Sequence, residues 1–191
     1  MLENKKIGFA FTGSFCTFKR VIKQLSLLAD EGCDIFPIMS ETAYSTDTRF
    51  GKAADFQEQI KEICKKDIIH TISDAEPIGP KKMLDLLIIA PCTGNTLAKL
   101  ACGITDTSVT LAAKAHLRNQ RPVLTAVSTN DGLANAAKNI GMLQNYKNYY
   151  FVPYSQDDCI SKERSLVADF SEIIPAAKAV FSGIQIQPIL K

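Results

Sequence analysis

A doubly wound α/β fold is what the sequence predicts: one parallel β-sheet with helices on both of its faces. Apolar runs with the length of buried strands alternate with segments of helical periodicity along the 191 residues. Each strand-like run ends in a short polar turn, and no Pro-, Gly- or Ser-rich linker divides the chain. Such an alternation is typical of parallel sheets that are covered on both sides.

The first half of the chain predicts two strand–helix units. Residues 6–12 are mostly apolar and predict a strand, and apolar residues then recur every three or four positions over 15–29. Residues 34–40 predict the second strand, and 53–65 predict the second amphipathic helix. We expect loops in the two stretches without a clear period, 40–48 and 68–80, with a short strand at 68–72 in the second.

The second half predicts further units of the same kind. Strands are expected at 84–90, 122–127 and 149–153. The expected helices are 95–102, 108–117, 133–143 and 164–183, the last with a kink at Pro175. We therefore expect a single Rossmann-like or flavodoxin-like domain over residues 1–191, whose C-terminal helix packs on it or on a neighbouring subunit.

Composition and charge exclude several classes of function. A net charge of +2 gives no reason to expect nucleic acid or an acidic membrane surface as a partner. The apolar run at 84–90 is far shorter than the ~20 residues that span a membrane, and the run at 7–11 is too short for a signal peptide. We expect a cytoplasmic protein.

Cysteine and histidine are placed in ways that argue against a metal site. The six cysteines form no CxxC pair and have no zinc-like spacing with the two histidines. We expect most of the thiols to be small core residues, with Cys92 as the exception because it follows a strand in a polar turn. His116, in a helical run, is expected to be a surface or packing residue, and His70 lies in an irregular segment.

Four polar turns follow strands that should all end at the same edge of the sheet, where doubly wound proteins bind ligands. The turns are rich in hydroxyls, amides and glycine and poor in charge. The candidate residues are Thr12, Gly13, Ser14, Ser40, Thr42, Pro91, Cys92, Thr93, Asn95, Thr96, Ser128 and Asn130. Such groups suit a phosphate, or a polar heteroaromatic ring that needs both donors and acceptors.

Each turn also has a purely structural interpretation, because small polar residues commonly cap the helix that follows them. The turn at 12–14 lacks a GxGxxG pattern, and Ser40, Asn95 or Ser128 could each be no more than a capping residue. Asp131 fits a favourable charge in the first turn of a helix. No Ser–His–Asp set or carboxylate pair is defined by spacing.

The turn at 91–96 carries a family resemblance. It reads Pro-Cys-Thr-Gly-Asn-Thr and, with Thr12-Gly-Ser and the phrase at 97–106, resembles the Pro-Ala-Ser-Ala-Asn-Thr segment of homo-oligomeric flavin-containing cysteine decarboxylases. Cys92-Thr93 and Thr96-Leu-Ala also resemble the flavin prenyltransferases of the same flavoprotein superfamily.

Longer phrases resemble one branch of this superfamily over nearly the whole chain. They begin at Glu76, Gly103, Ala113, Ser128 and Tyr150. This branch implies oxidation of dihydrodipicolinate to dipicolinate (pyridine-2,6-dicarboxylate) in the mother cell of a spore-forming bacterium. It also implies an A subunit as partner and a homo-oligomer, a trimer or a dodecamer, because relatives build the flavin site between subunits.

The resemblance further implies FMN as cofactor. Its phosphate would lie on Gly13, Ser14, Ser40 and Thr42, and its ring near residues 91–96. Ser128 and Asn130 would bind the substrate or the edge of the flavin. NAD(P) is expected on the A subunit, because this chain lacks a GxGxxG turn followed by an acidic residue. Cations for a dicarboxylate are expected from Lys114, Arg118 and Arg121, of this chain or of an adjacent copy, and no base is identified.

Departures from the wider family bear on the reaction. The decarboxylases have a histidine before the strand that leads to Pro91, where residues 76–82 here have none. Their Pro-x-Met-Asn motif is Val-Ser-Thr-Asn at 127–130, and the Arg-Glu pair of the prenyltransferases is missing. Decarboxylation and prenyl transfer are therefore disfavoured. The alternatives are a flavin-dependent decarboxylase of a cysteine-derived acid, or a non-catalytic partner of the A subunit with a vestigial flavin site.

Overall fold

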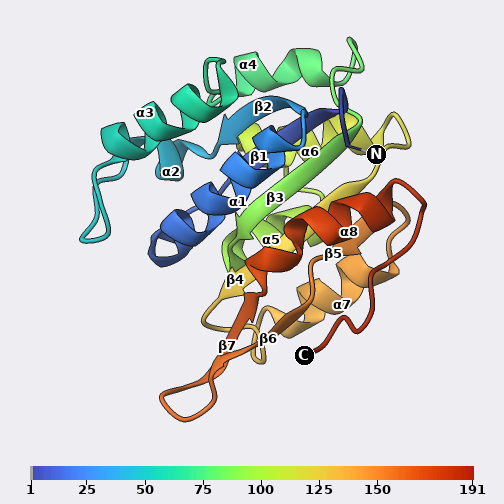
Figure 1. Cartoon of the computed structure of the whole chain (residues 1–191). Helices are drawn as coiled ribbons and strands as arrows, with labels where there is room; N and C mark the ends of the chain where they lie inside the picture. The colour runs from blue at the N-terminus through green and yellow to red at the C-terminus, as the bar shows by residue number, and fades with distance from the viewer. Residues whose placement is uncertain (1) are drawn as a thin grey trace.

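A mostly parallel sheet forms the centre of the computed structural model, which describes residues 2–191 (Figure 1). Within these residues the sheet has seven strands. They are β1 (Lys6–Phe11), β2 (Asp34–Met39), β3 (Leu86–Cys92), β4 (Val123–Thr129), β5 (Tyr149–Phe151), β6 (Tyr154–Asp158) and β7 (Lys162–Ala168). The helices are α1 (Phe18–Asp30), α2 (Glu41–Ser45), α3 (Ala53–Cys64), α4 (Ile72–Ala75), α5 (Gly94–Ala101), α6 (Ser108–Leu117), α7 (Ala137–Asn145) and α8 (Ile173–Val180).

The order of the strands reverses between β1 and β3. The parallel strands lie in the order β2-β1-β3-β4-β5, so the chain first moves outward from β1 to β2 and then continues on the other side with β3. Right-handed crossovers in opposite directions place their helices on opposite faces of the sheet. Accordingly α1 and α8 pack on one face, and α5 and α6 pack on the other (Figure 1). The predicted doubly wound fold is confirmed.

Burial on both faces explains the strand sequences. Every residue of β3 is buried, and β4 is buried except at Thr129. A strand covered on both sides reads as a continuous apolar run rather than an alternating one. This is why the sequence located β1, β3 and β4 well.

The outer edge of β4 is shared by two different pairings. Its first half, Val123–Thr125, pairs in parallel with β5, whereas Ser128 and Thr129 pair antiparallel with β7. The hairpin of β6 and β7 therefore extends beyond the carboxyl end of β4 (Figure 1). An antiparallel addition to a parallel sheet is common in this class of fold.

The predicted helix over 164–183 is wrong in its first half. Residues up to Ala168 form β7, a 3-10 turn follows at Phe170–Glu172, and α8 covers only Ile173–Val180. The apolar spacing looked helical because Leu166 of the strand happens to continue the period of α8. Pro175 is the third residue of α8, where the missing N–H has no partner within the helix, so no kink is required there.

Other boundaries also differ from the prediction. The loop expected at 40–48 contains α2, and the strand expected at 68–72 is reduced to one bridge between Ile38 and Ile69. The helix expected from 133 begins at Ala137. The helix at 108–117 is confirmed in full, because Thr107 and Thr110 form a reciprocal capping box at its start.

Candidate functional site

One buried hydroxyl joins the turns that follow β1 and β3. Thr12 donates from Oγ1 to the carbonyl of Pro91 at 2.7 Å and accepts from the N–H of Thr93 at 3.0 Å. These turns lie at the position where the strand order reverses. The crevice at such a switch point, at the carboxyl ends of the strands, is where open α/β sheets bind their ligands.

The turns after β2 and β4 join the same edge. The hydroxyls of Ser14 and Ser128 lie 2.7 Å apart, which links the β1 turn to the end of β4. A Cβ built on Gly13 would lie 3.8 Å from the methyl group of Thr42, so the β2 turn borders the β1 turn. All four predicted turns therefore meet at one edge of the sheet.

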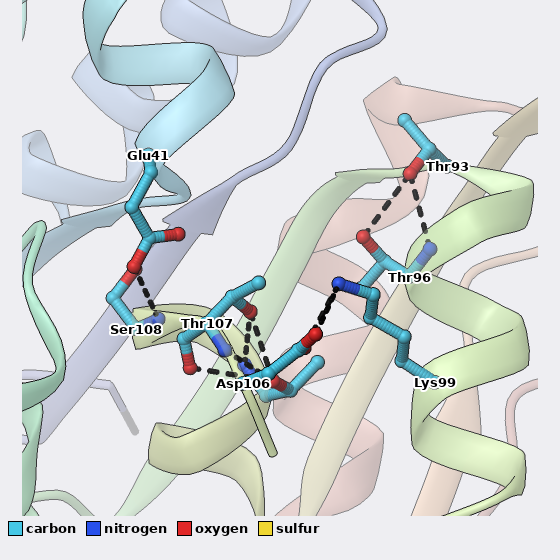
Figure 2. A network of polar contacts seen from close by, with 8 residues as sticks. Glu41, Thr93, Thr96, Lys99, Asp106, Thr107 and Ser108 are labelled. Carbon is cyan, nitrogen blue, oxygen red and sulfur yellow. Dashed lines mark hydrogen bonds and ion pairs between the residues drawn. The ribbon is translucent and has the colours of Figure 1, made fainter. Parts of the chain in front are cut away.

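The start of α5 is packed tightly against the β4 turn. A Cβ on Gly94 would lie 2.7 Å from both the Asp131 carboxylate and the Thr129 hydroxyl, so a side chain does not fit there without movement. Thr93 caps the helix by accepting from the N–H of Thr96 at 3.2 Å, as Figure 2 shows. The close approach fixes Asn95, in the first turn of α5, beside the end of β4.

The start of α6 is anchored to the β2 turn. Ser108 donates its hydroxyl to the carbonyl of Met39 at 2.6 Å. Its backbone N–H donates to the Glu41 carboxylate at 3.1 Å, a contact that Figure 2 shows. Lys99 of α5 pairs with Asp106 at 2.8 Å just before α6. The prediction did not assign Glu41, Ser108, Lys99 or Asp106 a role, although Thr107-x-x-Thr110 is a readable capping pattern.

The candidate side chains divide into two groups. Thr12, Thr93 and Thr96 are bound to one another or to the backbone, and Ser40 accepts from the N–H of Ala43 at 3.3 Å. These four side chains therefore have the structural role, capping a helix or joining turns, that was the alternative to ligand binding. The other group has unused polar atoms: within residues 2–191, no side-chain hydrogen bond is formed by the exposed Thr42, Asn95 and Asn130. The Ser14–Ser128 pair keeps one further O–H, and Ser14 Oγ also lies 3.9 Å from the sulfur of Cys16.

The burial of the cysteines is the opposite of the prediction that most of them lie in the core and Cys92 does not. Cys92 is fully buried, and burial raises the pKa of its thiol, so it is a neutral core residue rather than an exposed member of the turn. Of the others only Cys64 is buried, whereas Cys16, Cys102 and Cys159 are exposed. The burial of a cysteine was mispredicted because its apolar neighbours in the sequence do not show which face of a helix or turn its side chain occupies.

Both histidines have structural surroundings. His116 is buried and lies 2.9 Å from the carbonyl of Pro122, which only accepts, so Nε2 carries the proton. Burial lowers its pKa to about 4. His70 stacks on Tyr44 with 3.8 Å between the ring centroids. The packing role expected of His116 is confirmed.

The cations expected for a dicarboxylate lie at the opposite edge of the protein's own sheet. Lys114 lies about 9 Å along α6 from Ser108 at its start, and Arg118, which directly follows α6, lies about 15 Å from it. Arg121 pairs with Asp85, which precedes β3, at 3.3 Å. The prediction is therefore wrong for the site within one chain, because a helix that follows a parallel strand returns toward the amino edge.

Among residues 2–191, no cluster of His, Cys, Asp and Glu has the arrangement of a metal site. Over the same range, no helix combines the length and the apolar character needed to cross a membrane.

The fold and this edge define a class of protein. The sequence profile of the flavoprotein family matches residues 1–180, and the chain belongs to that family. It is 41% identical to the B subunit of dipicolinate synthase from Bacillus subtilis, over 99% of this chain and 94% of that protein. The crystal structure of the corresponding dipicolinate synthase protein from Bacillus halodurans is 40% identical and has a TM-score of 0.92, covering 100% of this chain and 97% of that one.

A more distant structure shares the fold alone. The FMN-dependent cysteine decarboxylase SpaF is 20% identical, with a TM-score of 0.70 over 95% of this chain and 98% of its own.

Proposed function

We propose that the chain binds FMN at the carboxyl edge of the sheet. The donor set suits the group: hydroxyls at Ser14 and Thr42 beside the Gly13 backbone offer donors for a phosphate, and the Asn95 carboxamide offers both a donor and an acceptor for a heteroaromatic ring. Pro91 and Cys92, which are buried, would supply apolar packing below the ring rather than polar contacts. Membership of the flavoprotein family supports this assignment.

The proposed reaction is oxidation of dihydrodipicolinate to dipicolinate, together with an A subunit. The observation that carries this proposal is the similarity to the B subunit of dipicolinate synthase, which extends over nearly all of both chains. The oxidation removes a hydride and a proton from the dihydropyridine ring. Bound flavin would supply a hydride acceptor beside the substrate.

The chain's own residues would position the reactants. The bonds of Thr12 to Pro91 and Thr93 hold two turns in one arrangement, and the Ser14–Ser128 bond fixes a third. Asn130, which is exposed beside Ser128, would contact the substrate or the flavin edge. Orientation of this kind lowers the entropic part of the barrier.

Partners and location complete the proposal. NAD(P) would be held by the A subunit, and this chain would form a homo-oligomer, a trimer or a dodecamer. The reaction would take place in the cytoplasm of the mother cell of a spore-forming bacterium. The similar proteins are named as one of the subunits of a synthase, which supports the existence of a second kind of subunit.

Reconstitution tests the function. Oxidation of dihydrodipicolinate by the purified A subunit is measured alone, with this chain, and with its Asn95→Ala variant. We expect turnover to need this chain and to fall at least tenfold with the variant, which loses a ring contact. Unchanged turnover in both comparisons would exclude a catalytic role. The matched control is Gln59→Ala, an exposed amide on α3.

A further inference from the structure

A second polar feature lies beside the strand-end site. A cavity of about 420 Å³ is lined by Asn130 of the β4 turn and by residues 160–164 at the tip of the β6–β7 hairpin. Residues 160–164 contain no motif from which a role could be predicted. The cavity is therefore built from two segments that only the folded chain brings together.

The cavity adjoins the turns that form the candidate flavin site. Asn130 follows Ser128, whose hydroxyl lies 2.7 Å from that of Ser14, and it precedes Asp131, against which Gly94 is packed. The hairpin is held over this turn by two bonds. Leu133 donates its N–H to the carbonyl of Arg164 at 3.0 Å, and Ser165 donates its hydroxyl to the carbonyl of Thr129 at 3.2 Å.

Two cations of β7, Lys162 and Arg164, line the cavity beside the same turn. The pairing of β7 with β6 shifts in register between Lys162 and Leu166, so this end of β7 is irregular. Leu166 lies directly against Gly132, where an added Cβ would come within 2.5 Å of it. Lys162 and Arg164 line the cavity together with Asn130, and Glu163 between them lines it as well.

Of the two cations, Arg164 is the one whose side chain forms no ion pair within residues 2–191. Lys162 is bound to Asp157 at 2.6 Å, which neutralises it. Over residues 2–191 the guanidinium of Arg164 forms no ion pair and no side-chain hydrogen bond. Its planar fork matches a carboxylate in a bidentate geometry, and the Asn130 carboxamide adds a neutral donor on the other side of the cavity.

We infer that Arg164 and Asn130 form a carboxylate subsite for a planar heteroaromatic dicarboxylate, with Lys162 at its rim. The inference rests on the proposed function, because that function supplies the ligand class. One carboxylate would bind Arg164, which leaves the ring directed toward the flavin turns at Asn95. Arg164 is thus a specificity-determining residue that selects a second carboxylate on the ring.

Dipicolinate itself is the probe that tests the subsite. Its dissociation constant is measured by calorimetry on the full chain, in wild type and in Arg164→Gln, with picolinate, which has one carboxylate, as the comparison ligand. We expect the wild type to prefer dipicolinate over picolinate and Arg164→Gln to bind dipicolinate at least tenfold more weakly, with the preference lost. Equal binding by both proteins, or no binding to the wild type, overturns the inference.

Two further measurements separate this test from the proposed function. Arg49→Gln replaces an exposed arginine in the loop between α2 and α3 and should bind dipicolinate as the wild type does; equal weakening in this control would indicate nonspecific attraction and overturn the inference. FMN binding is followed by fluorescence quenching and should be the same in wild type and Arg164→Gln. Absent FMN binding would remove the flavin proposal, while a dipicolinate preference that depends on Arg164 would still support the subsite.

Discussion

The two edges of the same sheet use their polar groups in opposite ways. At the amino edge, Arg121 binds the carbonyls of Lys82 and Leu84 and the Asp85 carboxylate, and Asp85 also accepts from the N–H of Lys6 at 3.0 Å. At the same edge, His116 donates from Nε2 to the carbonyl of Pro122. At the carboxyl edge, hydroxyls and amides outnumber charged groups, and several of them have no partner within the described chain.

The difference shows where the fold is closed and where it can receive a ligand. Satisfied polar groups stabilise a protein, whereas polar groups with unused capacity are available to bind. The carboxyl edge contains both kinds in contact: Thr12 holds the turns, and Asn95 and Thr42 offer free groups. Substitutions at the two edges should therefore separate stability from binding.

The largest effect on stability is expected from Thr12→Val. The substitution keeps the volume but leaves the Pro91 carbonyl and the Thr93 N–H without their partner, at a combined cost of about 3 kcal/mol in unfolding free energy. Urea denaturation measures it. FMN affinity should fall as well, because the two turns are no longer joined. The control Thr12→Ser keeps the hydroxyl, and equal losses in Ser and Val would contradict the role given to the hydrogen bonds.

Arg121→Met at the amino edge should cost about 2 kcal/mol in unfolding free energy, because it removes three hydrogen bonds and leaves Asp85 without its ion-pair partner while keeping much of the apolar contact. FMN and dipicolinate affinities should not change. Denaturation and fluorescence quenching on the same preparation check both statements. A loss of ligand affinity with the native fold intact would show that the two edges are not independent.

Much of this comparison was predictable from the sequence. The strands β1, β3 and β4 were located because burial on both faces produces continuous apolar runs, and parallel topology then required their turns to meet. The hairpin was not predicted, because residues 154–164 are polar and their pairing depends on the end of β4. Non-local contacts of this kind leave no local pattern.

The roles of individual site residues were harder to predict than the site's location. Thr12 and Pro91 are 79 positions apart in the chain, so nothing near Thr12 shows that its hydroxyl is used internally. Cys92 was expected in the polar turn but is the last residue of β3, buried beneath it. Lys114 and Arg118 lie away from the site within one chain, because α6 runs from the carboxyl edge toward the amino edge of the sheet.

A smaller effect should appear as the pH is lowered through the titration of His116. Burial lowers its pKa from 6.5 to about 4 in the folded protein, so between these values the unfolded chain binds a proton that the folded chain does not. Stability from this group is full above pH 6.5 and is lost as the pH falls. We expect a loss of roughly 1 kcal/mol between pH 6.5 and pH 5.5.

Urea denaturation at several pH values, for wild type and His116→Gln, measures this contribution. Glutamine can still donate to the Pro122 carbonyl but does not titrate, so its pH dependence should be flatter by the same amount. Identical slopes for the two proteins would contradict a neutral His116 in the folded state.

The smallest effect on stability, and a large one on binding, is expected from Asn95→Ala. Asn95 is exposed in the first turn of α5, its side chain makes no hydrogen bond within residues 2–191, and alanine is the better helix former, so unfolding free energy should change by less than about 0.5 kcal/mol. FMN affinity should nevertheless fall about tenfold, the size expected for one lost hydrogen bond to a polar ring. The control Gln59→Ala should change neither quantity. If Asn95→Ala binds FMN as tightly as the wild type, the free amide at the carboxyl edge has no role in binding, and the distinction drawn between the two edges would then hold for stability alone.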